Sequence, residues 1–180
     1  FDSLMLRVQS VWPQAGIVHR LDMMTSGIIV MAMHKDALRF LNRQFQDRLT
    51  DKYYIAKVSG HMESDRGSID LPLICDWPNR PKQKVCYETG KPSLTHFEVL
   101  ERGDSQGQQW TRVKLIPITG RSHQLRVHLK ELGHPILGDR LYAPDDVIAQ
   151  ASRLQLHAER LEICHPATEQ KLVFEKPCEF

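Results

Sequence analysis

The sequence HRLDMMTSG at residues 19–27 runs directly into the apolar, β-branched stretch IIVMAM at residues 28–33. The second stretch predicts a buried β-strand, and the Thr-Ser-Gly sequence before it predicts a tight turn. Asp22 would therefore lie beside a buried strand, where a carboxylate loses hydration unless a cation or several hydrogen-bond donors compensate. Proteins use such a carboxylate either as a structural ion-pair partner or as a reactive group, and this stretch alone leaves both interpretations open.

The composition is that of a globular protein with one self-sufficient core: 180 residues, of which 41% are hydrophobic and 26% charged. No apolar run reaches the roughly 20 residues needed to span a bilayer, and the first residues do not have the pattern of a signal peptide. A formal net charge of +2 does not identify a nucleic-acid-binding protein, so such a role must depend on local patches. The cysteines (Cys75, Cys86, Cys164 and Cys178) form no Cys-x-x-Cys pair, which favours free thiols in a reducing cytoplasm over disulfides or a zinc site.

The hydrophobic pattern predicts an α+β fold. Helices are expected at residues 1–11, 35–49 and 121–132, and the second should turn Leu38, Leu41, Phe45 and Leu49 toward the core. Strands are expected at residues 53–59, 94–101, 110–117, 158–163 and 171–175. Long strands with few helices between them indicate a mostly antiparallel mixed sheet with flanking helices and loops. We interpret the turn-rich residues 64–92 as an excursion from this sheet.

Two of these elements carry candidate site residues. Tyr53 and Tyr54 must point to opposite faces of their strand, so one can pack in the core while the other faces a cleft. On the helix over 121–132, Arg121 and Arg126 lie about 140° apart, so one could meet a carboxylate and the other a phosphate. His123 and His128 are poorly spaced for two ligands on one helical face, and we expect no metal site.

The excursion contains a basic and aromatic segment at residues 76–92. Arg80, Lys82 and Lys84 are interleaved there with Trp77 and Tyr87. This combination suits contacts to phosphates together with stacking on unpaired bases. A charged surface loop without any nucleic-acid partner can have the same composition.

Taken together, these segments resemble the RluA family of pseudouridine synthases. The resemblance is carried by the run at 19–27, Lys52-x-Tyr54, the TGRSHQLR run at 119–126 and the GHPILGD run at 133–139. It extends over nearly all of the chain. It implies a pseudouridine synthase catalytic domain built around a central cleft, which isomerises uridines in RNA to pseudouridine without a cofactor or metal. Residues 71–92 most resemble the dual-specificity members, which implies stem-loops of 23S rRNA and of tRNA anticodons as substrates.

The resemblance also implies roles for individual residues. Asp22 is the catalytic carboxylate, which either attacks C1′ of the sugar or removes a proton from C2′. Arg126 pairs with this carboxylate, and Tyr54 stacks on the target base and can help to move the C5 proton. Arg20 fills the gap left when the target base leaves its stack. The further RNA contacts that we predict are His19, Thr25, Arg121, Gln124, Arg80, Lys82 and Lys84.

The chain departs from the family pattern in two places. Members usually begin with a strand that carries an Asn-Lys-Pro-x-Gly motif, which would precede Phe1, so we expect residues 1–180 to be a single catalytic domain without its N-terminal strand. Ser93 and His96 stand where the family favours Ala and an acidic residue, which could shift contacts to RNA. We expect a cytoplasmic monomer.

Two other functions remain open from the sequence. The first is an RNA-binding module without turnover, because the N-terminal motif is not present. The second is a hydrolase of glycosidic bonds, which requires two acids flanking the bond; no second acid is evident beside Asp22.

Overall fold

The computed structural model describes residues 2–180 and contains one seven-stranded sheet with the order β11-β10-β4-β9-β8-β5, in which β2 pairs with β10. All pairs are antiparallel except that of β2 with β10, so the predicted mostly antiparallel sheet is confirmed. The strands are β2 (Ser26–Gly27), β4 (Asp51–Ser59), β5 (Arg66–Asp70), β8 (Leu94–Ser105), β9 (Gln108–Pro117), β10 (Leu156–Cys164) and β11 (Lys171–Glu175).

Four α-helices and two small sheets accompany this sheet in the described residues. The helices are α1 (Leu4–Gln9), α2 (Lys35–Gln46), α3 (Gln124–Glu131) and α4 (Asp145–Ile148). The small sheets pair β1 (Gly16–Ile17) with β3 (Met31–Ala32) and β6 (Leu73–Cys75) with β7 (Gln83–Val85). A 3-10 helix, Trp77–Asn79, lies between β6 and β7. None of the helices in residues 2–180 is long and apolar enough to cross a membrane.

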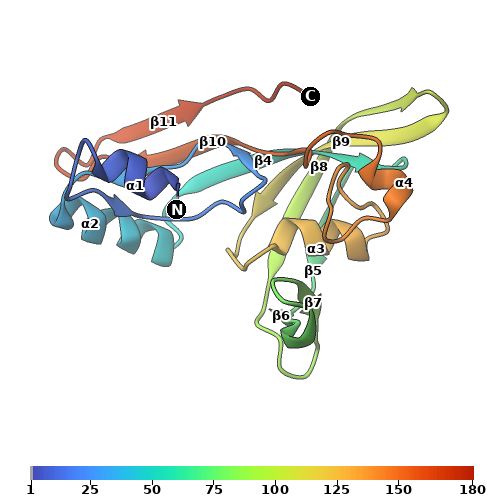
Figure 1. Cartoon of the computed structure of the whole chain (residues 1–180), viewed down its shortest axis with the longest axis horizontal. Coiled ribbons are helices and arrows are strands. Elements are labelled where there is room, and N and C mark those ends of the chain that lie inside the picture. Colours follow the sequence, from blue (N-terminus) through green and yellow to red (C-terminus); the bar gives the residue numbers. More distant parts are fainter. Residues whose placement is uncertain (1) are drawn as a thin grey trace.

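Helices α2 and α3 lie on the same side of the large sheet (Figure 1). Leu41 of α2 belongs to a buried cluster with Leu161 and Ile163 of β10. Leu125 and Leu129 of α3 belong to a second cluster that includes residues of β4, β8 and β9. Each helix thus has its own apolar contact with the sheet.

The prediction of a buried strand over residues 28–33 is wrong. This stretch is divided between two partners: the backbone N–H of Ile28 donates to Ala158 of β10, whereas Met31 and Ala32 form β3 against β1. The chain crosses from one sheet to the other between these points, and most of its side chains are only half-buried. The apolar composition therefore reflects packing on α2, where Ile28, Val30 and Ala32 join the cluster of Leu41.

The helix boundaries also differ from the predicted ones. Helix α1 is shorter than the expected 1–11, of which Phe1 lies outside the described residues. Helix α2 ends at Gln46 and Arg48 has a positive φ of 58°, so Leu49 is exposed instead of facing the core. Helix α3 begins at Gln124, because His123 before it has a φ of 53°.

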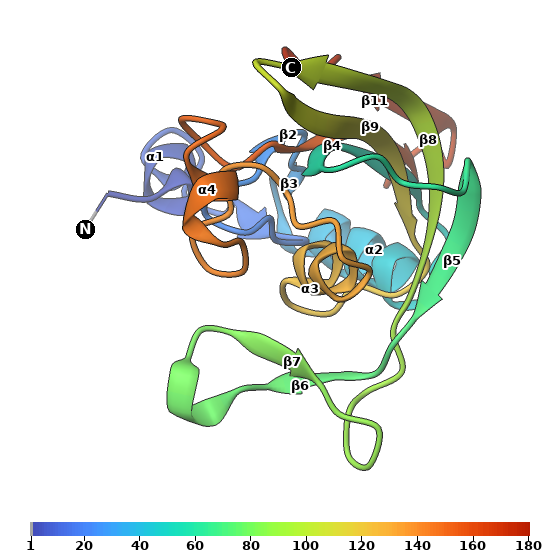
Figure 2. The same ribbon diagram turned by 90° about the vertical axis from the view of Figure 1, so that its right-hand side faces the viewer.

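The excursion at residues 64–92 is only partly outside the large sheet. Residues 66–70 form β5, which pairs with β8 at the edge of the sheet, so that part of the prediction is wrong. Residues 73–85 form the β6–β7 hairpin, which stands away from the sheet on the side of α3 (Figure 2). Leu73 is its main buried anchor.

Candidate active site

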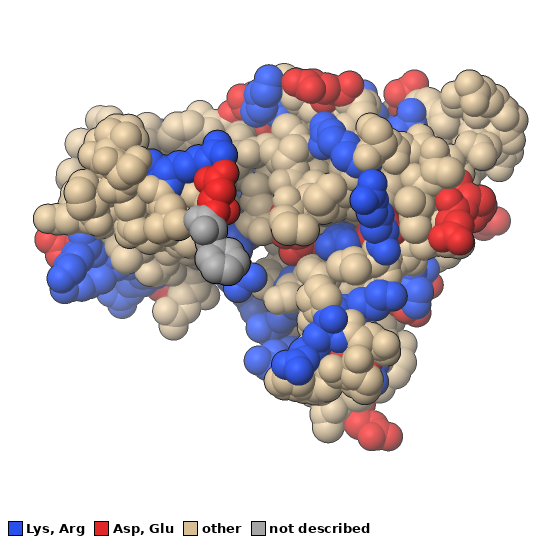
Figure 3. All heavy atoms as spheres, in the orientation of Figure 1, with Lys and Arg blue, Asp and Glu red and all other residues tan. Residues whose placement is uncertain are grey.

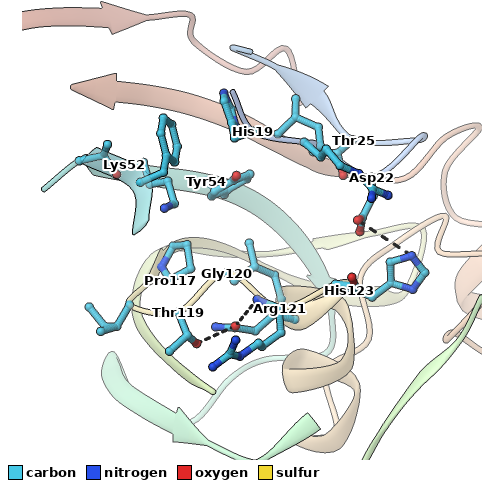
Figure 4. Close-up of a pocket in the computed structure, with 18 of the residues that line it drawn as sticks. His19, Asp22, Thr25, Lys52, Tyr54, Pro117, Thr119, Gly120, Arg121 and His123 are labelled. Carbon is cyan, nitrogen blue, oxygen red and sulfur yellow. Dashed lines mark hydrogen bonds and ion pairs between the residues drawn. The ribbon is translucent and has the colours of Figure 1, made fainter. Parts of the chain in front are cut away.

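A cleft of about 860 Å³ lies between the C-terminal end of α2 and the N-terminal end of α3. Strand β4 lines it with Lys52 and Tyr54, and strand β10 with Leu156. The loops at residues 17–25 and 116–123 form further walls (Figure 4). Its volume is in the range of sites that hold small organic molecules.

The loop that carries Asp22 is fixed at both ends. At the start, Nε2 of His19 accepts a hydrogen bond from the backbone N–H of Val30 at 3.0 Å, and its ring stacks on Phe45. Burial lowers the pKa of His19 to about 4, so the imidazole is neutral. At the end, Gly27 lies so close to β10 that a Cβ would meet the Ala158 oxygen at 2.2 Å. His19 and Gly27, the first and last residues of the motif, therefore each have a structural role that fixes the loop.

Asp22 lies between these anchors, with 24% of its side chain exposed to the cleft. Its Oδ2 is 3.4 Å from Nη1 of Arg126, and its Oδ1 is 4.0 Å from Nε2 of His123. The structure thus brings Asp22 and Arg126 together as predicted, although their hydrogen bond is long.

The closer partner of Arg126 is Asp139, which sequence reasoning missed. Asp139 accepts from Nε of Arg126 at 2.8 Å and from Nη2 at 2.6 Å, and only 1% of its side chain is exposed. Burial alone would lower the pKa of Arg126, but the hydrogen bond and charge of Asp139, together with Asp22, raise it. Asp139 ends the motif at 133–139, and this was the available signal.

The two adjacent tyrosines point to opposite faces of β4, as expected. Tyr54 lines the cleft and packs against the buried cluster under α3, whereas the Tyr53 ring lies 4.4 Å from Nζ of Lys114. Burial and the charge of Asp22 raise the pKa of Tyr54 to about 12. Its hydroxyl is therefore protonated at neutral pH.

Lys52 is a second cleft residue to which the sequence assigned no role. It lies two positions from Tyr54 and therefore on the same face of β4, with Nζ 5.5 Å from the centre of the Phe45 ring. Burial lowers its pKa. It has no ion pair within the part of the chain that the structure describes, and the neighbouring Asp51 is paired with Arg160. A half-buried cation without an ion pair favours an anionic ligand.

The other predicted residues of the cleft differ in their exposure and in the hydrogen bonds that they already make. Arg20 and Arg121 are exposed and line the cleft, and Nε of Arg121 also donates to the Pro92 carbonyl at 3.2 Å. Thr25 lines it as well, and its buried hydroxyl has no hydrogen-bond partner among residues 2–180. Arg121 and Arg126 meet different partners, but Arg121 lies before the start of α3, so the helical angle from which this was predicted does not apply.

Gln124 is buried and its amide is fully used by protein atoms. Its Oε1 accepts from the Thr119 hydroxyl and the Arg121 N–H, and its Nε2 donates to the Leu94 carbonyl and the Thr95 hydroxyl. Direct contact with RNA would require breaking these bonds. The bonds to Thr119 and Arg121 instead show that the Gln124 side chain orders the loop that carries Arg121.

Arg80, Lys82 and Lys84 do not line the cleft but lie on the β6–β7 hairpin. Lys84 is 3.4 Å from an oxygen of Asp76, and Arg80 lies over the ring of Trp77. Lys and Arg side chains also gather around the hollow that separates the part of the molecule containing α2 from this hairpin (Figure 3). Within residues 2–180 no group of three or more His, Cys, Asp and Glu could hold a metal ion.

Comparisons with known proteins agree with these features. The sequence model described as RNA pseudouridylate synthase matches residues 8–131. The chain is 58% identical over 179 residues to the dual-specificity RNA pseudouridine synthase RluA of Salmonella typhimurium, with 99% of this chain and 80% of the relative covered. The enzyme of that name from Yersinia pestis is 59% identical, with 99% and 85% covered.

A solved structure supports the same assignment. Human RNA Pseudouridylate Synthase Domain Containing 1 is 32% identical and superimposes with a TM-score of 0.87, covering 99% of this chain and 75% of that one. The predicted α+β fold around a cleft is thereby confirmed. The chain belongs to the RNA pseudouridylate synthase family.

Proposed function

We propose that this synthase isomerises uridines in RNA with Asp22 as its catalytic carboxylate. The observation that carries the proposal is the position of Asp22 at the cleft, with Oδ2 3.4 Å from Arg126 and with Tyr54 on the wall of the same cleft. The reaction breaks the N1–C1′ bond, turns the base and joins C5 to C1′. Asp22 attacks C1′ or removes a proton from C2′, and both routes require an ionised carboxylate, which Arg126 supports.

Tyr54 is proposed to hold the target base by stacking. Since its pKa is raised to about 12, its hydroxyl can donate a hydrogen bond to the base but is a poor general base at neutral pH. The target base must leave its stack to reach the cleft. We propose that Arg20, which is exposed at the rim, fills the place that the base leaves.

We propose stem-loops of 23S rRNA and of tRNA anticodons as substrates. This is supported by the resemblance of residues 71–92 to dual-specificity members and by the words "dual-specificity" in the names of the relatives. We further propose that residues 1–180 act as one catalytic domain and as a monomer. Free thiols at all four cysteines support a cytoplasmic location.

The decisive assay for this function incubates the purified chain with uridine-containing stem-loops and detects pseudouridine by chemical labelling. The hydrolase alternative predicts release of free uracil, whereas isomerisation keeps the base in the polymer. The second acid that a hydrolase needs is not supplied by Asp139, which is buried and bound to Arg126, nor by Asp51, which is paired with Arg160. Family membership favours turnover over an RNA-binding module.

Replacing both Lys82 and Lys84 by Ala should weaken RNA binding, more strongly at low salt than at high salt. Each lost phosphate contact should reduce the slope of log Kd against log salt concentration by about 0.7 for unpaired RNA. The measurement is a salt titration of RNA affinity. The control is Lys171→Ala with Lys176→Ala, which changes net charge equally at the β11 edge. An unchanged slope for the hairpin variant would remove the hairpin from the interface.

Replacing Lys52 by Met should lower kcat/KM while leaving the protein as stable or more stable. We propose that Lys52 contacts an RNA phosphate, and loss of this charged hydrogen bond should cost about tenfold or more in binding. The removed cation is half-buried and has no ion pair among the described residues. Steady-state kinetics and thermal unfolding test the two halves separately. Lys57→Met is the matched control, because Lys57 lies on the same strand over the Trp110 ring. Full activity of the Lys52 variant contradicts a phosphate contact.

A further inference from the structure

We propose that His123 is a positioning residue for Asp22, and that Tyr142 fixes its imidazole in the neutral form that presents an N–H to this carboxylate. The proposal rests on the proposed role of Asp22. It assigns a function to two residues outside the Asp22, Tyr54 and Arg126 set.

Each oxygen of the Asp22 carboxylate faces its own nitrogen. Arg126 lies 3.4 Å from Oδ2, and Nε2 of His123 lies 4.0 Å from Oδ1 (Figure 4). The second distance is longer than a hydrogen bond, so in this arrangement the imidazole faces the carboxylate without bonding to it. Only 13% of the His123 side chain is exposed, so the imidazole is restricted in its position.

The hydrogen bonds of Tyr142 determine where His123 carries its proton. The Tyr142 oxygen accepts from the backbone N–H of Gln83 at 2.8 Å and lies 2.6 Å from Nδ1 of His123. A phenol has one hydrogen, and the only acceptor in this pair of contacts is Nδ1. The Tyr142 hydroxyl has no other acceptor within hydrogen-bond distance among the described residues, so the arrangement that uses its hydrogen has Tyr142 donating to an unprotonated Nδ1. The single imidazole proton is then on Nε2, facing Asp22.

The surroundings of His123 also favour the neutral ring. Burial lowers its pKa and so does the charge of Arg126, which together outweigh the opposing charges of Asp22 and Asp139. An imidazolium would form an ion pair with Asp22 and make the carboxylate a weaker nucleophile or base. A neutral N–H donor can orient the carboxylate without this cost.

Two backbone features hold the arrangement in place. His123 has a φ of 53°, a left-handed conformation that aims its ring differently from the helical residues that follow. Gln83 belongs to β7, so the same hydrogen bonds connect the β6–β7 hairpin to the residue facing Asp22. The hairpin that we propose as an RNA contact is thus joined by hydrogen bonds to His123, which faces the catalytic carboxylate.

Replacing Tyr142 by Phe tests the proposal on activity. We expect kcat to fall by about tenfold to a hundredfold, as for a misplaced reacting group, with little change in KM. Because Nδ1 loses its donor, the pKa of His123 should rise, so kcat should begin to fall at a higher pH as the solution is acidified. A merely structural role would not move this acidic limb. Tyr53→Phe is the control. It also removes a tyrosine hydroxyl, but one on the face of β4 opposite Tyr54, and it should leave the pH profile of kcat unchanged.

A second variant separates the imidazole from the fold. His123→Asn keeps a residue that tolerates positive φ, and we expect a similar loss of kcat without the shift of the acidic limb to higher pH, since no imidazole remains to be protonated. Wild-type kcat for His123→Asn would overturn the proposal.

The tautomer is also measurable without any reaction. Nitrogen-15 chemical shifts of histidine-labelled wild-type protein should show His123 protonated on Nε2 alone at neutral pH. Protonation on Nδ1, or on both nitrogens, would overturn the proposal even if the enzyme is active. If Asp22→Asn keeps full activity while the shifts are as expected, the role of Asp22 fails and the assignment of the His123 tautomer stands.

Discussion

Replacing Asp22 by Asn is expected to abolish pseudouridine formation, with a loss of at least about 10⁴-fold as when other catalytic nucleophiles or bases are removed. The amide has the same shape and can still accept from Arg126, but it cannot attack C1′ or take a proton from C2′. RNA binding should remain near wild type, because the contacts proposed for the RNA backbone lie on other residues. Single-turnover assays with labelled stem-loops and a separate binding titration measure the two quantities.

Asp36→Asn is the matched control for this change. Asp36 lies in the first turn of α2 and is exposed, and its one ion pair among the described residues is with Arg39, so its variant should retain full turnover. Near-normal turnover by the Asp22 variant would show that another group performs the chemistry. Loss of RNA binding together with turnover would show that the carboxylate is needed to build the cleft.

The strands of the large sheet could be predicted because their pattern is local. Residues 94–101 and 110–117 mix apolar and polar side chains in partial alternation, and they lie within β8 and β9 respectively. Residues 28–33 have an equally apolar pattern, but their pairing depends on β10 and β1, which are distant in sequence or belong to another sheet. Strand β5 was missed because its sequence, RGSID, has a single large apolar side chain for the core.

The part of the site that could be predicted is the part whose residues lie in sequence motifs. Asp22 and Tyr54 line one cleft, and the buried Arg126 lies 3.4 Å from Asp22, so the structure brings the three residues together as the resemblance implied. The roles of Asp139 and His123 could not be predicted, because sequence spacing does not show which guanidinium nitrogen faces which carboxylate. The long turn between α3 and α4 brings Asp139 beside Arg126, thirteen positions earlier in the chain.

Replacing Arg126 by Ala is expected to lower the free energy of unfolding by about 3–5 kcal/mol, the usual cost of leaving a buried charge without its partner. From the sequence, the stranded charge would be Asp22; in the structure it is Asp139, which is 1% exposed and loses two short hydrogen bonds. Two backbone N–H groups, of Leu141 and Tyr142, still reach the Asp139 carboxylate but cannot neutralise it. Urea unfolding at neutral pH measures the loss.

Arg66→Ala shows why burial, and not the length of the ion pair, determines this cost. Arg66 and Glu98 are also 2.6 Å apart, but 78% and 34% of their side chains are exposed, so water replaces the lost partner and the expected change is about 0–1 kcal/mol. Equal losses for the two arginine variants would contradict the argument. Removing both members of the buried pair, Arg126→Met with Asp139→Leu, should recover part of the stability because no charge remains stranded. Turnover should remain absent, since Asp22 then has no guanidinium beside it.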